Sequence, residues 1–338
     1  MKLVLALGDV SSLVLKLPRS TGSLQGLNKT GEIAVASGGT TDIWRGLWND
    51  KRVAFKAFRI YPSQDLSDAK KIIWRLAPVW KRLKHDNVLP FHGVDTSLFQ
   101  LALVYEWGHS GDITQYLKSK PDASRPRLLL QVAKALQYLH SLDVVHGDLK
   151  GANVLISKSG DAQVCDYGLS PIISNPTFTI AATPGVAGSS RWLAPEIIDP
   201  PGGAGSKPLT ASKSADVFAF AMLAVEVFAG KVPFGDMKNE SVVVQIVAGK
   251  RPDKPLAAEQ LGLSAEMWKF TEKCWSQNPN KRPSIDQVVN AWEGFVSGDN
   301  NPKAVGRRSQ FAATSTTIHN EKDSYPQNRG KRRFCCLV

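Results

Sequence analysis

Patterns typical of strands and of helices occupy different parts of this chain. Before residue 61, three segments alternate apolar and polar residues, and short turn sequences separate them. These segments are residues 33–37, 42–48 and 52–60. They predict an antiparallel meander, and residues 98–106 predict one more strand. After Gly111 the apolar residues recur with helical spacing. This segregation predicts an α+β fold with a β-rich N-terminal part and a mainly helical C-terminal part.

The expected helices differ in character. Residues 66–83 have helical spacing, although Pro78 should kink or end that helix. Asp112 is a good N-cap for a short helix. Residues 126–141 place their apolar side chains on one face, whereas residues 217–230 are apolar on all sides and predict a buried central helix. Two closing helices are expected at residues 267–275 and 285–295.

Composition excludes several classes of protein. Hydrophobic residues make up 43% of the chain and charged residues 21%, which rules out a wholly disordered protein. The four cysteines are too few for a disulfide framework and lack the spacing of a zinc site, so we expect a reducing, cytoplasmic environment. The longest uncharged apolar run, residues 217–225, is about half a membrane span. The apolar N-terminal stretch is too short for a secretory signal.

Positive charge is concentrated near the C-terminus. The chain has a net charge of +12, and residues 301–338 alone carry +6. A basic tail favours an acidic partner surface, either a membrane or a nucleic acid. The remaining charge is diffuse, and no recognition helix, aromatic platform or zinc motif accompanies it, so we expect no nucleic-acid partner. The polar composition after Gly298 predicts a disordered tail over residues 297–338.

Four motifs stand in a characteristic order along the chain. Residues 53–56 read VAFK within a predicted strand, and residues 146–153 read HGDLKGAN between two short apolar runs. Residues 166–168 read DYG, and residues 194–196 read APE after a long loop. With these motifs the chain resembles the eukaryotic protein kinases of the tyrosine-kinase-like group. The resemblance implies a two-lobed kinase domain over residues 31–296, after an N-terminal lead at 1–30. The N-lobe would span residues 31–107 and the C-lobe residues 108–296.

The resemblance also implies roles for five residues in phosphoryl transfer, with ATP and Mg²⁺ as cofactors. Lys56 would hold the α- and β-phosphates, Asp166 would bind Mg²⁺, and Asn153 would bind a second ion. Asp148 would accept or orient the proton of the acceptor hydroxyl. Lys150, two residues further on, is typical of kinases that act on serine and threonine, and it would neutralise the γ-phosphate.

The glycine-rich loop is only partly present. The family pattern falls on Ala36, Gly38, Thr41 and Ile43, so one of its three glycines remains, and Gly39 adds flexibility. Backbone amides can still face a phosphate there, although Ala36 and Thr41 restrict a positive φ and a close approach.

The adenine-binding hinge is expected near residues 103–108. Tyr105 matches the gatekeeper position, and the backbones of Glu106 and of Trp107 and Gly108 would meet the adenine edge. Three apolar side chains would enclose the ring: Ile43, Ala54 and Leu155.

Two departures from the family pattern concern activity. The helix carboxylate that normally pairs with the strand lysine falls on Leu76, and Asp65 and Asp68 are too close to Lys56 in sequence to replace it. Gly147 stands where many kinases carry an arginine that binds a loop phosphate. These departures predict reduced activity, with a nucleotide-binding or scaffolding pseudokinase as the alternative function.

Further matches to the family concern the architecture of the C-lobe. Asp216 would brace the HGDLKGAN motif, residues 146–153, from the central helix; we call this motif the catalytic loop. Glu196 and Arg282 would form a buried ion pair. Ser189 occupies the position that contacts the catalytic loop in kinases of the serine/threonine type.

The last four residues fit the C-a-a-X prenylation pattern, with Cys335 as the acceptor. Four basic residues precede this box: Arg329, Lys331, Arg332 and Arg333. A lipid chain and a basic cluster together supply the two signals that stable membrane anchoring needs. The expected partners are therefore protein substrates and a membrane surface, with the protein peripheral on the cytosolic face.

Overall fold

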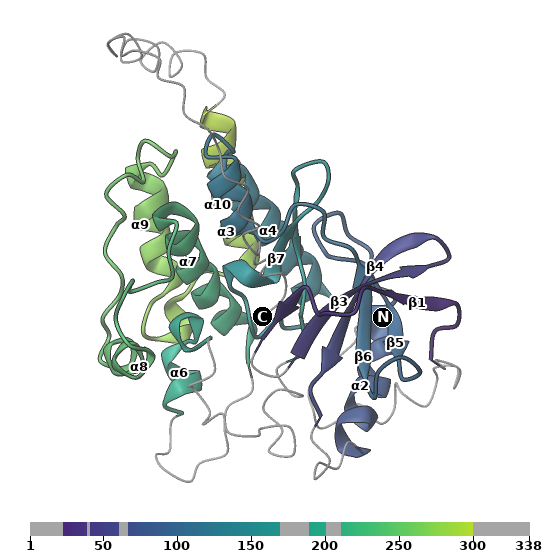
Figure 1. Cartoon of the computed structure of the whole chain (residues 1–338). Coiled ribbons are helices and arrows are strands. Elements are labelled where there is room, and N and C mark those ends of the chain that lie inside the picture. The colour runs from purple at the N-terminus through teal and green to yellow at the C-terminus, as the bar shows by residue number, and fades with distance from the viewer. Residues whose placement is uncertain (1–22, 39–40, 61–66, 170–188, 201–210, 300–338) are drawn as a thin grey trace, which may run out of the picture.

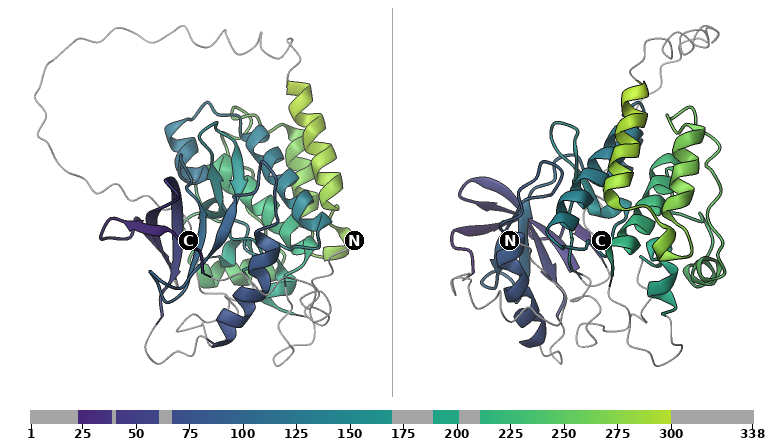
Figure 2. Two further views of the ribbon diagram at one scale, coloured as in Figure 1. Left: turned by 90° about the vertical axis from the view of Figure 1, so that its right-hand side faces the viewer. Right: turned by 180° about the vertical axis from the view of Figure 1, so that it is seen from behind.

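The computed structural model describes residues 23–38, 41–60, 67–169, 189–200 and 211–299. These residues form a sheet-based N-lobe beside a larger helical C-lobe (Figure 1). The predicted order, strands first and helices afterwards, is therefore confirmed. Views from the side and from behind show the same two-lobed arrangement (Figure 2).

The described strands of the N-lobe form one antiparallel sheet in the order β1-β3-β4-β6-β5, with β2 paired to β3. The strands are β1 (Leu27–Thr30), β2 (Ala36–Ser37), β3 (Thr41–Trp48), β4 (Lys51–Phe58), β5 (Phe91–Asp95) and β6 (Ala102–Glu106). The predicted antiparallel meander of the first three segments is confirmed, because β2 pairs with β3 and β3 pairs with β4. The later strands do not continue it in chain order, because β6 lies between β4 and β5. β6 is shorter than the expected strand at 98–106, and β1 begins before the expected domain boundary at residue 31.

The turn between β3 and β4 sets the register of the lobe. Asn49 and Asp50 both have positive φ, 48° and 63°, as in the two-residue turns that match the twist of paired strands. The register pairs Ile43 with Lys56. Along β4, Ala54 and Phe58 belong to the apolar cluster that continues into the C-lobe. Side chains alternate along a strand, so Lys56 projects from the same face, toward the C-lobe.

Helix α2 (Ser67–Trp80) packs beside β5. Pro78 lies inside its last turn, and the helix ends two residues later, three residues short of the predicted end. Its buried side chains are Ile73, Ala77 and Trp80, and the Trp80 ring meets Phe91 edge-on, with ring centroids 5.5 Å apart. Helix α2 is therefore held against the sheet by apolar contacts.

The described helices of the C-lobe surround one central helix, α7 (Lys213–Ala229). The others are α3 (Ile113–Ser119), α4 (Arg125–Ser141), α6 (Pro195–Ile198), α8 (Asn239–Val247), α9 (Ala265–Cys274) and α10 (Ile285–Asp299). Every α7 side chain from Ala215 to Phe228 is buried, as the apolar sequence predicts. Ser212 caps its N-terminus and Gly230 ends it with a φ of 66°. Asp112 caps α3, which is also as predicted.

A short hairpin joins the two lobes. It consists of β7 (Val154–Ile156) and β8 (Ala162–Val164), and it is bridged to Val88 on the N-lobe side and to Asp112 before α3. The loops that lead into β7 and out of β8 are thereby held at the boundary between the lobes.

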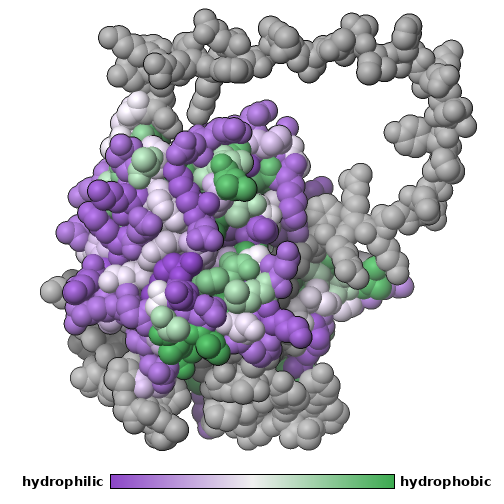
Figure 3. All heavy atoms as spheres, turned by 90° about the vertical axis from the view of Figure 1, so that its left-hand side faces the viewer, coloured by the Kyte–Doolittle hydropathy of each residue, from purple (hydrophilic) through white to green (hydrophobic). Residues whose placement is uncertain are grey.

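Apolar side chains on the outer surface of the C-lobe are scattered. The side of the molecule shown in Figure 3 is mainly hydrophilic, with separate apolar patches. Scattered apolar side chains are common on folded domains and mark no site by themselves. None of the helices within the described residues combines the length and the hydropathy needed to cross a membrane.

Candidate active site

Lys56 and Asp166 meet at the boundary between the lobes. The Lys56 ammonium lies 2.5 Å from Oδ2 of Asp166, and both side chains are almost fully buried. Lys56 comes from β4, whereas Asp166 follows β8 and has a φ of 61°. The structure thus brings together the two residues that the sequence analysis assigned to nucleotide phosphates and to Mg²⁺.

The position expected for a helix carboxylate has a different role. Leu76 is partly buried in α2 and packs against the main apolar core. Asp65 and the side chain of Asp68 lie outside the described residues. Asp166 therefore takes the place of a helix carboxylate as the partner of Lys56.

Asp148 belongs to the catalytic loop, and its side chain is 17% exposed. The Asn153 side-chain amide donates hydrogen bonds to the Asp148 backbone oxygen at 2.7 Å and to its Oδ2 at 2.9 Å. The Lys150 ammonium lies 3.3 Å from the same Oδ2 and donates to the Ser189 hydroxyl at 2.7 Å. The carboxylate is therefore oriented by two neighbours, and the predicted contact of Ser189 with this loop is confirmed.

Two buried oxygens in this site have no hydrogen-bond partner among the described residues. They are Oδ1 of Asn153 and Oδ1 of Asp166. Buried polar atoms normally have a hydrogen-bond partner. Two buried oxygens without one therefore suit a cation, which binds to oxygen lone pairs. Mg²⁺ prefers oxygen ligands and is commonly held by one or two protein groups together with substrate phosphates. The described residues contain no cluster of three or more His, Cys, Asp or Glu side chains that could hold a metal ion by themselves.

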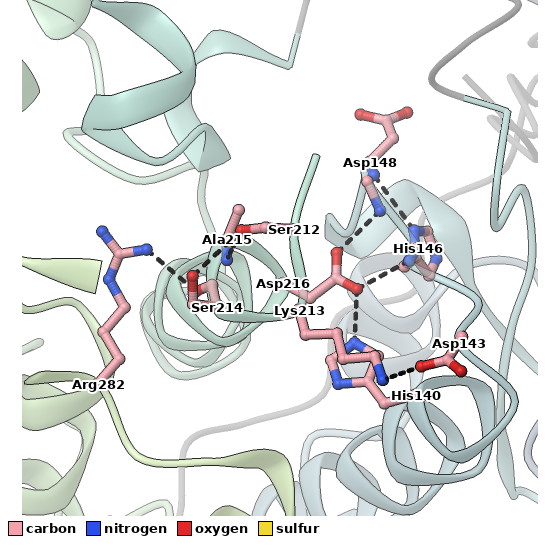
Figure 4. Close-up of polar contacts among 11 residues, drawn as sticks. His140, Asp143, His146, Asp148, Ser212, Lys213, Ser214, Ala215, Asp216 and Arg282 are labelled. Atoms are coloured by element: carbon pink, nitrogen blue, oxygen red, sulfur yellow. Dashed lines mark hydrogen bonds and ion pairs between the residues drawn. The ribbon is translucent and has the colours of Figure 1, made fainter. Parts of the chain in front are cut away.

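The catalytic loop is fixed to α7 by Asp216 (Figure 4). Its carboxylate accepts hydrogen bonds from the backbone N–H of His146 and of Gly147, each at 2.8 Å, and lies 2.8 Å from Nε2 of His140. Burial lowers the pKa of His146 below its usual value, which favours the neutral ring. Gly147 has a φ of 77°, a conformation that glycine adopts without steric cost. The predicted bracing role of Asp216 is confirmed.

The residues expected around adenine occupy both sides of the hinge. Ile43, Ala54 and Leu155 are buried in the same apolar cluster. A Cβ atom on Gly108 would lie 2.8 Å from Leu155 Cδ1, so a larger residue at this position would require the Leu155 side chain to shift. The Glu106 backbone N–H donates to the Pro90 oxygen at 2.9 Å.

The tyrosine at the expected gatekeeper position is buried. The Tyr105 ring packs edge-on against Phe91, with ring centroids 5.3 Å apart. Burial raises the pKa of its phenol, which keeps that group neutral.

The glycine-rich hairpin between β2 and β3 is held near its turn by Arg59. The Gly38 N–H donates to the Thr41 oxygen at 2.8 Å, and the Arg59 guanidinium donates to the Gly38 oxygen. Arg59 also pairs with Oδ1 of Asp42 at 3.1 Å. Gly39 lies outside the described residues.

Sequence reasoning found most of these side chains but missed two. Arg59 follows β4 and gives no signal in the sequence, because surface arginines are common. Glu226 accepts hydrogen bonds from the Gly151 N–H and from the Trp192 indole. It is the single charged residue in the apolar run 217–230, and that exception was a usable signal.

An ion pair in the C-lobe completes the match to the expected architecture. Arg282 donates two parallel hydrogen bonds to Glu196, each of 2.7 Å, and its side chain is fully buried. A bidentate pair of this kind is geometrically specific. The profile described as "Protein tyrosine and serine/threonine kinase" matches residues 31–292. This chain belongs to that protein kinase family.

Several curated kinases are similar to this family member. "Serine/threonine-protein kinase STY46" of Arabidopsis thaliana is 27% identical over 288 residues, which cover 84% of this chain and 46% of that protein. "Serine/threonine/tyrosine-protein kinase HT1" of the same plant is 29% identical over 267 residues, covering 77% and 64%. "RGS domain-containing serine/threonine-protein kinase A" of Dictyostelium discoideum is 26% identical over 271 residues, covering 78% and 22%. The chain spans less than half the length of the first and third of these relatives. The two-lobed kinase fold predicted from the sequence is confirmed.

Proposed function

We propose that this chain is a protein kinase that transfers the γ-phosphoryl group of ATP to serine or threonine hydroxyls of protein substrates, with Mg²⁺ as the cofactor. The observation that carries the proposal is the convergence of Lys56, Asp166, Asn153 and Asp148, with two partnerless oxygens among them. The Lys150–Ser189 contact and the names of the similar curated kinases favour serine and threonine as acceptors.

Each residue has a defined task in this proposal. Asp148 accepts the proton of the acceptor hydroxyl, and its carboxylate is aimed by Asn153 and Lys150. Lys56 binds the phosphates of ATP. Oδ1 of Asn153 and Oδ1 of Asp166 would hold Mg²⁺, which neutralises charge on the transferring phosphates when bound.

Turnover is expected to be slow. In the described structure Lys56 is paired with Asp166, and Leu76 supplies no carboxylate to hold the ammonium elsewhere. Small misplacements of a positioning group can lower a rate by about 10²-fold. A nucleotide-binding pseudokinase is the second candidate function, and the same two observations favour it.

The C-terminal tail supports a proposal about location. Residues 297–299 close α10 and residues 300–338 lie outside the described residues, so this proposal rests on sequence alone. We place the protein on the cytosolic face of a membrane, held by a prenyl group on Cys335 together with the four basic residues before it.

The deciding experiment measures transfer of labelled phosphate from ATP to a generic protein acceptor. Asp148→Asn should abolish turnover while nucleotide affinity stays within about twofold, because Asp148 serves the acceptor. Asp122→Asn is the matched control, since it makes the same chemical change at an exposed position. Nucleotide binding without turnover in the unaltered chain would favour the pseudokinase. Undiminished turnover in Asp148→Asn would overturn the kinase mechanism.

A further inference from the structure

Helix α2 and the turn that follows it carry an excess of positive charge. Residues 67–84 contain one acidic residue and six basic ones: Lys70, Lys71, Arg75, Lys81, Arg82 and Lys84. Residues 108–299 of the C-lobe contain 19 basic and 19 acidic residues, so that range has no net charge. The basic character of α2 is therefore a local feature of the N-lobe and not an average property of the domain.

The exposed side of α2 is the basic one. Ile73, Ala77 and Trp80 are buried and hold the opposite side of the helix against the lobe. Lys71 and Arg75 are both exposed, and residues four positions apart lie on one side of a helix. In the left view of Figure 2, α2 lies at the front, and no described element crosses in front of it. Among the described residues, this side of the N-lobe is therefore open to a large partner.

The basic surface continues beyond the end of the helix. The backbone N–H groups of Lys81 and Arg82 donate to carbonyl oxygens in the last turn of α2, at 2.9 and 3.0 Å. The chain therefore keeps its helical path there, and the side chains of Lys81, Arg82 and Lys84 are all exposed. We refer to Lys71, Arg75, Lys81, Arg82 and Lys84 as the α2 basic face. At the rise of a helix, this face is about 20 Å long.

Most of the α2 basic face lacks an acidic partner. Four of its members form no ion pair with any described residue: Arg75, Lys81, Arg82 and Lys84. Lysines on the C-lobe helices differ, since Lys134 pairs with Glu293 at 2.7 Å and Lys213 pairs with Asp143 at 2.6 Å. Cations that are held side by side without counter-charges create a positive potential that attracts anions. The face therefore favours an anionic partner.

The composition of the face indicates what kind of anionic partner fits. Six large apolar side chains are exposed among the described residues, and none of them lies within residues 67–84. Stable protein–protein interfaces usually have an apolar or aromatic centre, which this surface does not offer. An anionic lipid leaflet presents a continuous negative surface and binds basic residues without an apolar anchor. The leaflet therefore fits the α2 basic face better than an acidic protein segment does.

We propose that the α2 basic face binds an anionic lipid leaflet and thereby orients the kinase domain on the membrane. This inference extends the membrane location proposed above, which attaches only the tail and leaves the orientation of the domain open. Helix α10 ends on the side of the molecule away from α2 (Figures 1 and 2). The 29 residues at positions 300–328 reach about 100 Å when fully extended, so both attachments fit on one leaflet.

The expected strength of this contact is modest. Each basic residue near an anionic leaflet strengthens binding about fivefold, and salt screens the attraction. A basic surface without a lipid chain therefore binds reversibly, which is why stable anchoring needs a second signal. The α2 basic face sets the orientation of a protein that the tail retains at the membrane.

The first experiment measures the partition of the full chain onto phosphatidylcholine vesicles with about one third phosphatidylserine, at about 0.1 M salt. The chain carries Cys335→Ser, so the result does not depend on the proposed lipid. Replacing Arg75, Lys81, Arg82 and Lys84 with Gln should weaken binding at least about twentyfold. The matched control replaces four exposed C-lobe lysines with Gln and should weaken binding less than about threefold: Lys231, Lys250, Lys269 and Lys273. Thermal unfolding confirms that both variants are folded.

An equal loss of binding in the two variants would overturn the inference, because net charge and not the α2 basic face would then decide. Undiminished vesicle binding by the α2 variant would also overturn it and would assign the face to an acidic protein segment instead. Neither result bears on phosphoryl transfer or on prenylation, which are tested separately by the ATP assay and by cell fractionation.

The second experiment needs no substitution in α2. The same Cys335→Ser chain is acetylated with an amine-reactive reagent, with and without the anionic vesicles, and mass spectrometry measures the modification of each lysine. Vesicles should slow the acetylation of Lys81 and Lys84 about fivefold, because those ammonium groups then contact lipid headgroups. Lys269 and Lys273 on α9 should react at unchanged rates. Equal protection of the lysines on the two lobes, or no protection of Lys81 and Lys84, would overturn the proposed orientation.

Discussion

Lys56 and Asp166 are 110 positions apart in the sequence, and their side chains form a buried ion pair. The motifs identify both residues but do not reveal that they pair with each other. Family resemblance leads to a search for a carboxylate on helix α2, where the matching position is Leu76. Which carboxylate meets an ammonium depends on how the elements pack, and sequence spacing carries no information about that distance.

Among the site residues of the C-lobe, some contacts could be predicted from the sequence and others could not. Asp216 and Ser189 are identified by their motif positions, and the structure places both in contact with the catalytic loop. Glu226 breaks an apolar pattern and was visible in the sequence. Its two donors were not, because Gly151 and Trp192 show no pattern that links them to α7.

Leu76 gives the prediction that belongs to this scale. Leu76→Glu would place a carboxylate against the apolar core, and we expect it to lower the free energy of unfolding by about 1–3 kcal/mol. It should not raise kinase activity, because the side chain at position 76 packs against the apolar core and would not be presented to Lys56. Urea denaturation and the phosphate-transfer assay measure the two effects. Leu76→Met, which keeps the apolar volume, is the control and should cost less than about 1.5 kcal/mol. Higher activity with unchanged stability would contradict this picture of α2.

At the scale of elements, strong and uniform hydrophobic patterns predicted helices and strands correctly, whereas weak patterns did not. Apart from Asp216 and Glu226, the buried side chains of helix α7 are apolar around its whole circumference, and this sequence leaves little alternative to burial. Helix α8 was missed because its run of valines resembles a strand and only Val242 and Ile246 are buried. Strand β5 was missed because Gly93 and a bulge interrupt its alternation. Tertiary packing decides the structure of such segments.

Arg59 links two elements of the N-lobe and gives a prediction at this scale. Its guanidinium binds the Gly38 carbonyl and the Asp42 carboxylate, so it restrains the hairpin between β2 and β3. Arg59→Gln should release that hairpin and weaken nucleotide affinity by about three- to tenfold, because a loop that must be ordered on binding lowers affinity. A fluorescent ADP analogue measures this affinity. Arg75→Gln on the exposed face of α2 is the control, and an equal loss of affinity in both variants would rule out a specific role for Arg59.

At the scale of the whole molecule, charge is divided unequally between the kinase domain and the tail. Half of the net charge of +12 belongs to residues 301–338. The two-lobed fold could be predicted from the sequence because the kinase motifs fall in the order typical of the family. The family match over residues 31–292 agrees with that prediction. The function of the tail has no such support, since composition alone does not specify a partner.

The tail gives a prediction about membrane binding. Each basic residue near an anionic leaflet contributes about 1 kcal/mol, so Arg329, Lys331, Arg332 and Arg333 together contribute about 4 kcal/mol. Cys335→Ser should move the full chain from the membrane fraction to the soluble fraction. Replacing the four basic residues with Gln should weaken membrane binding and make the remainder less sensitive to salt. Cys336→Ala, which keeps the acceptor cysteine, is the control. Equal fractionation of the unaltered chain and Cys335→Ser would show that the box is not used.

The contacts of Asp216 have a consequence for solvent exchange. The backbone N–H groups of His146 and Gly147 lie in a loop, and loop amides normally exchange their hydrogen with deuterium rapidly. Both donate to a carboxylate rooted in the most buried helix of the domain. Their exchange therefore requires the loop to separate from the Asp216 carboxylate on α7. These two loop amides should exchange far more slowly than loop amides that donate only to water.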